Sequence, residues 1–562
     1  MRARVQKVWI TLSITTVAAA FAILAFRVLS ADAVYSGDIS IKYLEARSLV
    51  ASRFRSLDLP NRGGTLDPDR QFYPIRPPFV LMAGGERHAI FPPAAEAFDA
   101  VLVAMGDYRA MILASLVAIV IVLWMACRLT GGPGAAAIPV LLGFGTPLWF
   151  YATTGWEHAS GVAFATAAFF IGARRETVGL REAALAGLLL GLGAALREEV
   201  LLLVPGLAFL LWLARRDFAG IIVAGLGVSV IMTLSSIAEV WWFHHPLAAH
   251  VLLNATQLLR EVLHMAPAST PGLLMPPPLS WHDRYAQVIQ SWWLGYSSSL
   301  AIAAFVVAWT LVIVLRQRRE WRMPMLVMLA ISIGLAVWDL WTLVGAPKVL
   351  PGLYRLSPFL IFALLPRLMK DGPARRWQLT AIVGAAAYMV LTFFGADVTG
   401  GKGFGPRVLL PILPLLVVAA WRNIYDHVRA RRSADRWIGV AGLSLVACAL
   451  AAEIGGALPA YVARNAEDAA VLNYVRAAPG QVVIADEPST AQFLLPLYYR
   501  KTVLLADVQY RADALAANLM REQFSYVVVV SRRDPDARMR WPGFECTAAA
   551  QIGRFTVEQW RR

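Results

Sequence analysis

Apolar blocks of about 20 residues, the length that crosses a bilayer as a helix, recur along most of the chain and limit its possible folds more than any other feature. Hydrophobic residues make up 58% of the 562 residues and charged residues 16%, whereas soluble globular domains have about 45–50% and about 25%. The chain is therefore predicted to be a polytopic α-helical membrane protein.

Thirteen transmembrane helices are expected from the positions of the blocks. They are 8–29, 101–126, 135–152, 156–172, 182–196, 200–214, 219–243, 297–315, 324–345, 353–366, 377–395, 405–420 and 438–459. The first block is longer than the roughly 7–15 residues of a signal-peptide core, so it is interpreted as an uncleaved span. Only Arg197-Glu198-Glu199 separates the fifth block from the sixth, and such a polar triplet is costly inside one long span. A tight outer turn is therefore expected there.

Basic residues gather in one alternating set of loops. With the N-terminus inside, the seven inner loops hold 22 Lys and Arg and seven acidic residues, which accounts for the whole net charge of +15. An excess of Lys and Arg in cytoplasmic loops is the usual signal of membrane orientation. The N-terminus is therefore expected in the cytoplasm and the C-terminus outside, and the basic balance gives no support for nucleic-acid binding.

The remaining polar length is expected on the outer side. It consists of a long loop at 31–100, a second loop at 244–296, short turns at 347–355 and 397–407, and a tail at 460–562. Two domains follow from this division: a transmembrane module at 1–459 and a small extracytoplasmic α/β domain at 460–562.

The tail alternates short β-branched runs with helical segments. Residues 482–485, 502–505 and 526–530 are expected strands, and 491–498 and 512–523 are expected helices. This alternation predicts a small parallel α/β layer. No Gly-rich phosphate-binding turn follows any of these strands, so a supporting or acceptor-docking role is expected rather than a nucleotide site.

Asp38 lies in the first outer loop, a few residues beyond the first span, where a lipid headgroup and a hydroxyl acceptor could meet. A carboxylate in this place could act as a general base, which typically contributes about 10²–10⁴ to a rate. The alternative is an N-cap for the helix expected at 39–51, because Asp is a favoured capping residue. Lys42, one turn later, could simply pair with Asp38.

Arg76 and Arg407 are candidates for holding a phosphate, because a guanidinium matches phosphate oxygens with two hydrogen bonds. Arg76 lies in the Pro-rich run 73–78, and Arg407 follows the Gly-rich turn 400–405. That turn is no P-loop, since it follows a helix and lacks the Gly-Lys-Ser/Thr ending. For each Arg alone, the alternative is an interfacial side chain that extends its charged end into water.

Glu157, His158, Arg197 and Glu198 lie at the outer ends of expected spans. Ionisable groups in such positions are candidates for substrate contact. The alternative is interfacial anchoring combined with mutual ion pairing.

No metal site is expected. His244 and His245 are adjacent and would point apart on a helix, and His250 follows without a carboxylate at ligand spacing. The three cysteines have no spacing that is typical of a zinc site or of a disulfide framework.

A series of motifs runs in order through the membrane part. They are Gly37-Asp38 with Tyr43-Leu44 and Ser48-Leu49, Leu57-Asp58-Leu59 with Asn61, the stretches 85–93, 146–151 and 195–198, and Phe404-Gly405-Pro406-Arg407 with Pro411 and Pro414. This series resembles bacterial phospholipid-carrier-dependent glycosyltransferases of the GT-C class, the relatives of the protein O-mannosyltransferases and of the lipid A aminoarabinose transferase. Thirteen spans with an outer α/β tail also fit that class.

The resemblance implies an inverting transferase that moves a sugar from a polyprenyl-phosphate carrier to an acceptor hydroxyl on the outer face of a bacterial inner membrane. Asp38 would be the base that activates the acceptor, and basic residues would hold the departing phosphate. Lys42, Tyr43, Arg76 and Arg407, with the four residues at the span ends, are the expected substrate contacts. No cofactor is implied, and the partners are the carrier-linked sugar, an acceptor on a glycan, lipid or protein, and membrane lipids.

Two other functions stay open. A transporter or lipid flippase would have a similar composition, although the spans show no inverted repeat and few mid-span charges. A non-catalytic membrane scaffold, whose outer domain binds a partner, is the other alternative. Asp339, the one clear mid-span acid, does not decide among the three.

Overall fold

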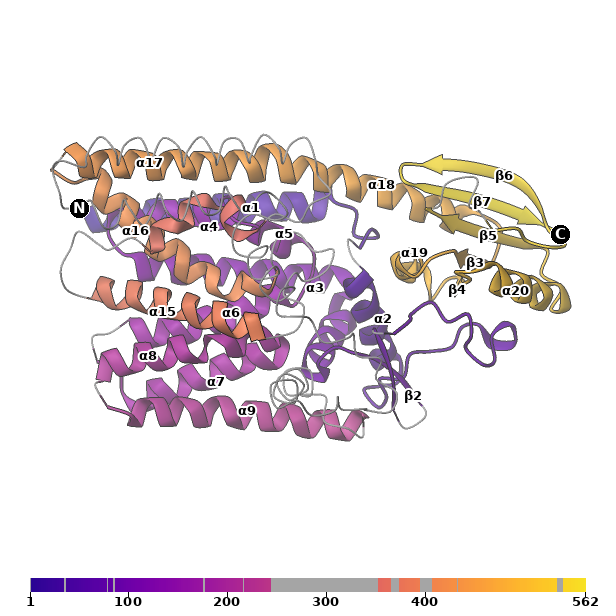
Figure 1. Ribbon diagram of the computed structural model, residues 1–562, viewed down its shortest axis with the longest axis horizontal. Helices are drawn as coiled ribbons and strands as arrows, with labels where there is room; N and C mark the ends of the chain where they lie inside the picture. The colour runs from indigo at the N-terminus through magenta and orange to yellow at the C-terminus, as the bar shows by residue number, and fades with distance from the viewer. Residues whose placement is uncertain are drawn as a thin grey trace.

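The computed structural model of the protein describes residues 2–34, 37–77, 79–83, 86–174, 177–215, 217–243, 352–364, 373–394, 407–431, 433–532 and 539–562. Long helices fill one end of the molecule and a β-sheet lies at the other (Figure 1). The N-terminus is at the far end of the helical part, and the C-terminus is beside the sheet.

Five helical segments of the described part are long and apolar enough to cross a membrane. They are Arg4–Val28, Pro93–Thr130, Ala219–Trp241, Arg407–Val428 and Asp435–Ala477. The prediction of a helical membrane protein with several spans is therefore confirmed. The spans expected at 297–315 and 324–345, and the outer loop at 244–296, lie outside the described residues.

The first half of the chain contributes most of the described bundle. Its helices are α1 (Arg2–Ile23), α3 (Pro93–Thr130), α4 (Ile138–Phe144), α5 (Leu148–Thr153), α6 (His158–Ala173), α7 (Leu180–Leu196), α8 (Val204–Arg215) and α9 (Ala219–Phe243). Shorter helical segments join them: a π segment at Leu24–Val28 and 3-10 segments at Pro133–Ala137 and Glu198–Leu203.

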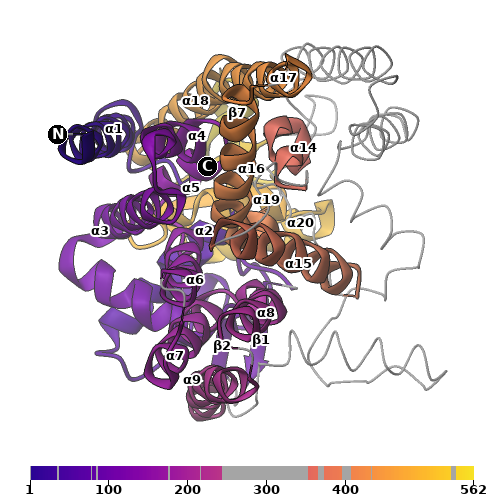
Figure 2. The same cartoon turned by 90° about the vertical axis from the view of Figure 1, so that its left-hand side faces the viewer.

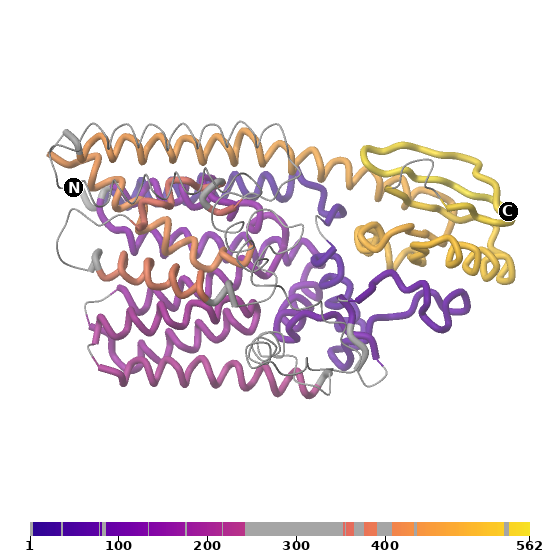
Figure 3. The backbone as a smooth tube through the Cα atoms, viewed as in Figure 1, coloured from indigo at the N-terminus to yellow at the C-terminus, as the bar shows by residue number. Residues whose placement is uncertain are grey.

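The second half adds helices around the same axis, as the end-on view shows (Figure 2). They are α14 (Leu353–Leu356), α15 (Pro373–Phe394), α16 (Leu413–Val428) and α17 (Ser433–Leu450), with 3-10 segments at Pro358–Ala363 and Arg407–Ile412. α17 continues through a π segment at Ala451–Ala457 into α18 (Leu458–Ala477), so one helical path leads from the bundle to the sheet (Figure 3). The boundary expected at 460 falls inside this path.

The block at 135–152, expected as one span, is divided into α4 and α5. Gly145 ends α4, and Pro147 immediately precedes α5. A proline disfavours helical backbone at the residue before it, so the helix is interrupted at Thr146.

Five strands form one mixed sheet in the order β4-β3-β5-β7-β6. β3 (Val482–Ala485) pairs in parallel with β4 (Thr502–Leu505) and β5 (Tyr526–Ser531), whereas β7 (Phe555–Arg561) runs antiparallel to β5 and to β6 (Glu545–Ile552). The three parallel strands were predicted, but the β6–β7 hairpin was not. The predicted parallel layer is thus confirmed for β3, β4 and β5, but the sheet as a whole is mixed.

The helices of the tail connect the parallel strands. α19 (Pro488–Phe493), with a 3-10 turn at Leu495–Leu497, follows β3, and α20 (Gln509–Arg521) follows β4. Both helices were expected, at 491–498 and at 512–523. Each observed helix begins three residues earlier than expected.

The first outer loop and the sheet share one hydrophobic core. Buried side chains from the two parts pack together: Leu59, Tyr73, Ile75, Val483 and Val530. The backbone N–H of Leu505 donates to the carbonyl of Phe72 at 2.8 Å, and the Tyr498 hydroxyl donates to the carbonyl of Pro60 at 2.6 Å. A small hairpin of β1 (Val80–Ala83) and β2 (Glu86–Ala89) belongs to the same loop. The loop and the tail thus form one folded body at the end of the bundle.

Small residues let α7 and α9 approach closely. A Cβ atom added at Gly187 would lie 2.1 Å from the carbonyl oxygen of Ala224, and one added at Gly191 would lie 2.9 Å from Cβ of Ile231. Close backbone approach through glycine is a common way for helices to associate in membranes, where lipid removes most of the hydrophobic driving force.

Gly187→Ala should lower the thermal unfolding midpoint of the purified protein in detergent, because the backbone of α9 cannot rotate away from the new methyl group. Overpacking of this kind costs typically about 1–3 kcal/mol. Gly225→Ala is the matched control: Gly225 is on α9, and an added Cβ there meets nothing within 4 Å. Equal midpoints for the two variants would contradict the close packing of α7 and α9.

Candidate functional site

The first polar helix, α2 (Gly37–Ala51), carries most of the candidate residues. It packs against α3 on one side and meets the sheet domain at its first residue. A Cβ atom at Gly37 would lie 2.1 Å from Oε1 of Gln492 in α19, so only glycine fits there without displacing Gln492. The start of α2 is thus held between the bundle and the outer domain.

Asp38 and Arg407 form a direct ion pair. Nη1 of Arg407 donates to Oδ2 of Asp38 at 2.5 Å, and the two side chains are 17% (Asp38) and 22% (Arg407) exposed. The guanidinium carbon of Arg407 also lies 5.5 Å from the centre of the Trp156 ring. The structure therefore brings together two predicted residues that are 369 positions apart, at a place that solvent reaches.

This pair can support two kinds of chemistry. A partly exposed carboxylate can accept a proton from a hydroxyl, and a guanidinium can bind the oxygens of a phosphate. Asp38 and Arg407 satisfy each other's charge. A bound anion would have to replace the carboxylate of Asp38 at Arg407 before Asp38 could act on another molecule.

Lys42 is on the same side of α2, one turn beyond Asp38, but it faces inward. Its side chain is 1% exposed and its ammonium donates to Oε1 of Glu157. The ammonium also lies 4.3 Å from the centre of the Phe91 ring. The structure thus pairs Lys42 with Glu157, not with Asp38.

Glu157, His158 and Arg197 meet behind this pair. Nη1 of Arg197 donates to Oε1 of Glu157 at 3.0 Å, and its Nη2 lies 2.8 Å from Oε1 of Glu199. The buried His158 ring lies between the two carboxylates, with Nδ1 3.9 Å from Glu157 and Nε2 3.8 Å from Glu199. Arg197 and Glu199 of the polar triplet thus belong to an internal ionic cluster.

Tyr43 faces a kink in α3. Its hydroxyl donates to Oδ1 of Asp107 at 2.5 Å, and Asp107 has a positive φ of 57° where the regular helix is interrupted. Burial and this hydrogen bond raise the pKa of Tyr43 above its ordinary value. Tyr43 therefore stays neutral and holds α2 to α3.

Arg76 is placed elsewhere. It donates from Nη2 to the carbonyl of Gln71 at 2.7 Å. Its pKa is lowered by burial and by the nearby guanidinium of Arg511, which belongs to α20 of the tail. The structure therefore places Arg76 between the outer loop and the sheet domain, and none of its described contacts involves the Asp38–Arg407 pair.

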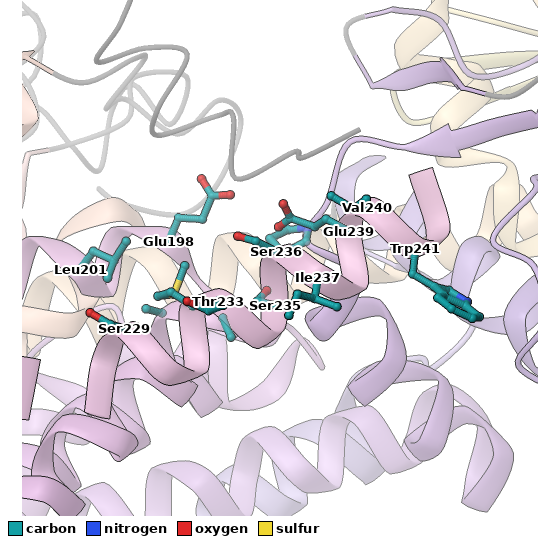
Figure 4. Close-up of a pocket in the computed structure, with 14 residues that line it drawn as sticks. Glu198, Leu201, Ser229, Thr233, Ser235, Ser236, Ile237, Glu239, Val240 and Trp241 are labelled. Carbon is teal, nitrogen blue, oxygen red and sulfur yellow. The ribbon is translucent and has the colours of Figure 1, made fainter. Parts of the chain in front are cut away.

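Glu198 lines a cavity of about 970 Å³ between α9 and the ends of α7 and the following 3-10 segment. Glu239 and Trp241 of α9 line the same cavity, as do Ser229 and Thr233 from earlier turns of the helix (Figure 4). Neither Asp38 nor Arg407 is among the lining residues. Glu198 thus faces a different space from the ion pair.

Three buried acids close to Lys42 were not identified from the sequence: Glu45, Glu96 and Asp99. Oε1 of Glu45 accepts the backbone N–H of Ala89 at 2.9 Å, and burial raises the pKa of Glu45 to about 8. The spacing along the sequence does place Glu45 beside two candidate residues. Asp38, Lys42 and Glu45 recur at intervals of four and three, which places them on one face of a helix.

Across the described residues, no group of three or more His, Cys, Asp or Glu side chains is arranged to hold a metal ion. The histidines at 244, 245 and 250 lie outside the described residues.

No family model matches the chain, and a search of the curated proteins finds no match. Among solved structures, the chain is similar to the crystal structure of ArnT from Cupriavidus metallidurans in the apo state. The similarity covers 98% of each chain, with 14% sequence identity and a TM-score of 0.46.

Glu45→Gln should make the stability of the protein less dependent on pH. Burial raises the pKa of Glu45 from 4.5 to about 8. Between these two pH values, Glu45 keeps its proton in the folded protein and loses it in the unfolded chain. This contribution to the free energy of unfolding is complete below about pH 4.5 and is lost as the pH rises through 8. One pKa unit corresponds to about 1.4 kcal/mol.

The measurement is the thermal unfolding midpoint between pH 5 and pH 9. The wild-type midpoint should fall over this range, and the midpoint of Glu45→Gln should fall less. Asp69→Asn, which changes an exposed acid of the same loop, should follow the wild type. Parallel curves for wild type and Glu45→Gln would show that Glu45 does not hold a proton in the folded protein.

Proposed function

We propose that this protein is a membrane glycosyltransferase that moves a sugar from a polyprenyl-phosphate carrier to an acceptor hydroxyl. The observation that carries the proposal is the partly exposed Asp38–Arg407 pair, where a potential base lies 2.5 Å from a potential phosphate-binding group. The sequence motifs that include both residues support the same function. Neither a transporter nor a scaffold requires this pairing.

In the proposed reaction, Arg407 exchanges Asp38 for the phosphate of the carrier. The oxygen of the acceptor hydroxyl then attacks the anomeric carbon of the sugar, and Asp38 accepts the proton of that hydroxyl. The new carbon–oxygen bond forms as the bond to the phosphate oxygen breaks, and polyprenyl phosphate leaves with the electron pair. Attack from the face opposite the leaving group inverts the configuration at the anomeric carbon. The reaction needs no cofactor.

The proposed setting is the outer leaflet of a bacterial inner membrane, with thirteen spans of the GT-C type, the N-terminus in the cytoplasm and the sheet domain in the periplasm. The distribution of basic residues supports this orientation. The transmembrane module would comprise 1–459 and the outer domain 460–562. The partners are the carrier-linked sugar, an acceptor that bears a hydroxyl group, and membrane lipids.

Asp38→Asn should reduce sugar transfer by about 10²–10⁴-fold, the usual contribution of a general base. The asparagine oxygen can still accept the hydrogen bond from Arg407, and Asp38 lies within the first turn of α2 and not at its N-cap, so the fold should stay intact. The measurement is transfer from polyprenyl-phosphate sugars by the purified protein, with the thermal unfolding midpoint recorded for each variant. Wild-type transfer by Asp38→Asn would exclude Asp38 as the base.

Arg407→Gln should weaken the binding of polyprenyl phosphate by about tenfold to a hundredfold, because a charge-assisted hydrogen bond contributes about 1.5–3 kcal/mol. Arg76→Gln is the matched control, because Arg76 is an arginine of the outer loop whose side chain donates to the carbonyl of Gln71. Equal losses of affinity in the two variants would contradict the assignment of Arg407.

A reporter enzyme that is active only in the cytoplasm should be silent when it is fused after Arg562, because the tail is proposed to lie outside. The same reporter fused after Val428 should be active, since the loop that follows α16 is rich in arginine. Activity of the Arg562 fusion would overturn the proposed orientation.

A further inference from the structure

Glu157 joins three segments through one carboxylate oxygen. It is the residue before α6, and its Oε1 accepts hydrogen bonds from Lys42 of α2 and from Arg197, which follows α7. Its own side chain is buried. A shift of α2 along α6 would therefore break a buried ion pair, which is costly because it leaves an uncompensated charge in the interior.

The positions of Asp38 and Arg407 both depend on contacts with Glu157 or with its neighbour in the chain. Asp38 is one turn before Lys42 on α2, so the Lys42–Glu157 contact sets the position of the first turn of α2 and of Asp38 within it. Arg407 packs on the ring of Trp156, the residue next to Glu157 in the chain. One short segment of backbone thus carries the supports of both charged groups.

Lys42 itself is in no position to contact a substrate. Its ammonium is enclosed by Glu157 and the Phe91 ring, and its side chain is among the largest that are fully buried. The carboxyls of Glu96 and Asp99 are also within electrostatic reach. Lys42 and Glu157 thus face each other in the interior, whereas Asp38 and Arg407 face solvent.

We infer that Glu157 is a positioning residue, which fixes the distance between Asp38 and Arg407 by anchoring α2 through Lys42 against α6 and Arg197. The catalytic role of Glu157 rests on the proposed glycosyl transfer, but its effect on the position of α2 can be measured without a substrate. It assigns to Lys42 and Glu157 a role without substrate contact.

The test uses a charge-neutral double variant, Lys42→Met/Glu157→Gln. Removing Glu157 alone would leave two buried cations without their shared partner, and the protein could fail to fold. The double variant removes one charge of each sign, and the amide that replaces the carboxylate keeps an oxygen that can accept from Arg197. The control is Arg215→Gln/Asp217→Asn, which removes a 2.9 Å ion pair at the other end of α8.

In sugar transfer, the double variant should lose about 10²-fold in turnover, the effect of a misplacement of roughly 1 Å in a reacting group. Its affinity for polyprenyl phosphate should stay at the wild-type value, and the control should match the wild type in both measurements. Wild-type turnover in the double variant would overturn the inference. A parallel loss of carrier affinity would also overturn it, because Lys42 or Glu157 would then contact the substrate.

A second measurement needs no substrate and separates this inference from the proposed function. Thermal unfolding midpoints are recorded for Asp38→Ala, Arg407→Ala and the combination of both, first in the wild-type background and then in Lys42→Met/Glu157→Gln. Residues in contact give non-additive shifts, so the wild-type background should show non-additivity and the double-variant background should show additive shifts. Equal non-additivity in both backgrounds would overturn the positioning role even if the protein transfers sugar.

Discussion

The buried Lys42–Glu157 ion pair is the interaction on which the arrangement of the site depends. Taking two charges out of water is unfavourable unless further partners complete their hydrogen bonds. Arg197 supplies such a partner to Glu157 and is itself paired with Glu199, and the Phe91 ring faces the Lys42 ammonium. Because so many groups must be in place at once, α2 has few alternative positions against α6, and its exposed end is placed as a consequence.

The sheet domain also contacts α2, on the side away from the bundle. Gly37 meets Gln492 of α19 without room for a side chain, and the guanidinium of Arg47 lies 4.4 Å from the Tyr499 ring. The outer loop also contributes to the core of the sheet. The tail therefore contributes to the site. The sheet domain contacts α2 on one side and the helical bundle contacts it on the other, and these contacts fix the position of Asp38.

Much of the fold could be predicted because it depends on local patterns. The apolar blocks indicated membrane helices, and the β-branched runs gave β3 and β4 with their observed ends. The β6–β7 hairpin was missed because β6 contains Ala548-Ala549-Ala550 and is largely exposed, so it lacks the composition that usually marks a strand. Its position is set by pairing with β7, which is a non-local contact.

The site was harder to predict because charged residues at helix ends look alike in sequence whether they reach into water, pair internally or face a ligand. Glu45 shares a helical face with Asp38 and Lys42, yet the periodicity alone gives no sign that this face is buried. Arg76 and Arg407 were equivalent as sequence candidates, and what separates them is the environment. Arg407 opens a helical segment beside Trp156, while Arg76 belongs to a loop that packs on the sheet. Among the predicted site residues, Asp38 and Arg407 form a partly exposed pair of complementary charges.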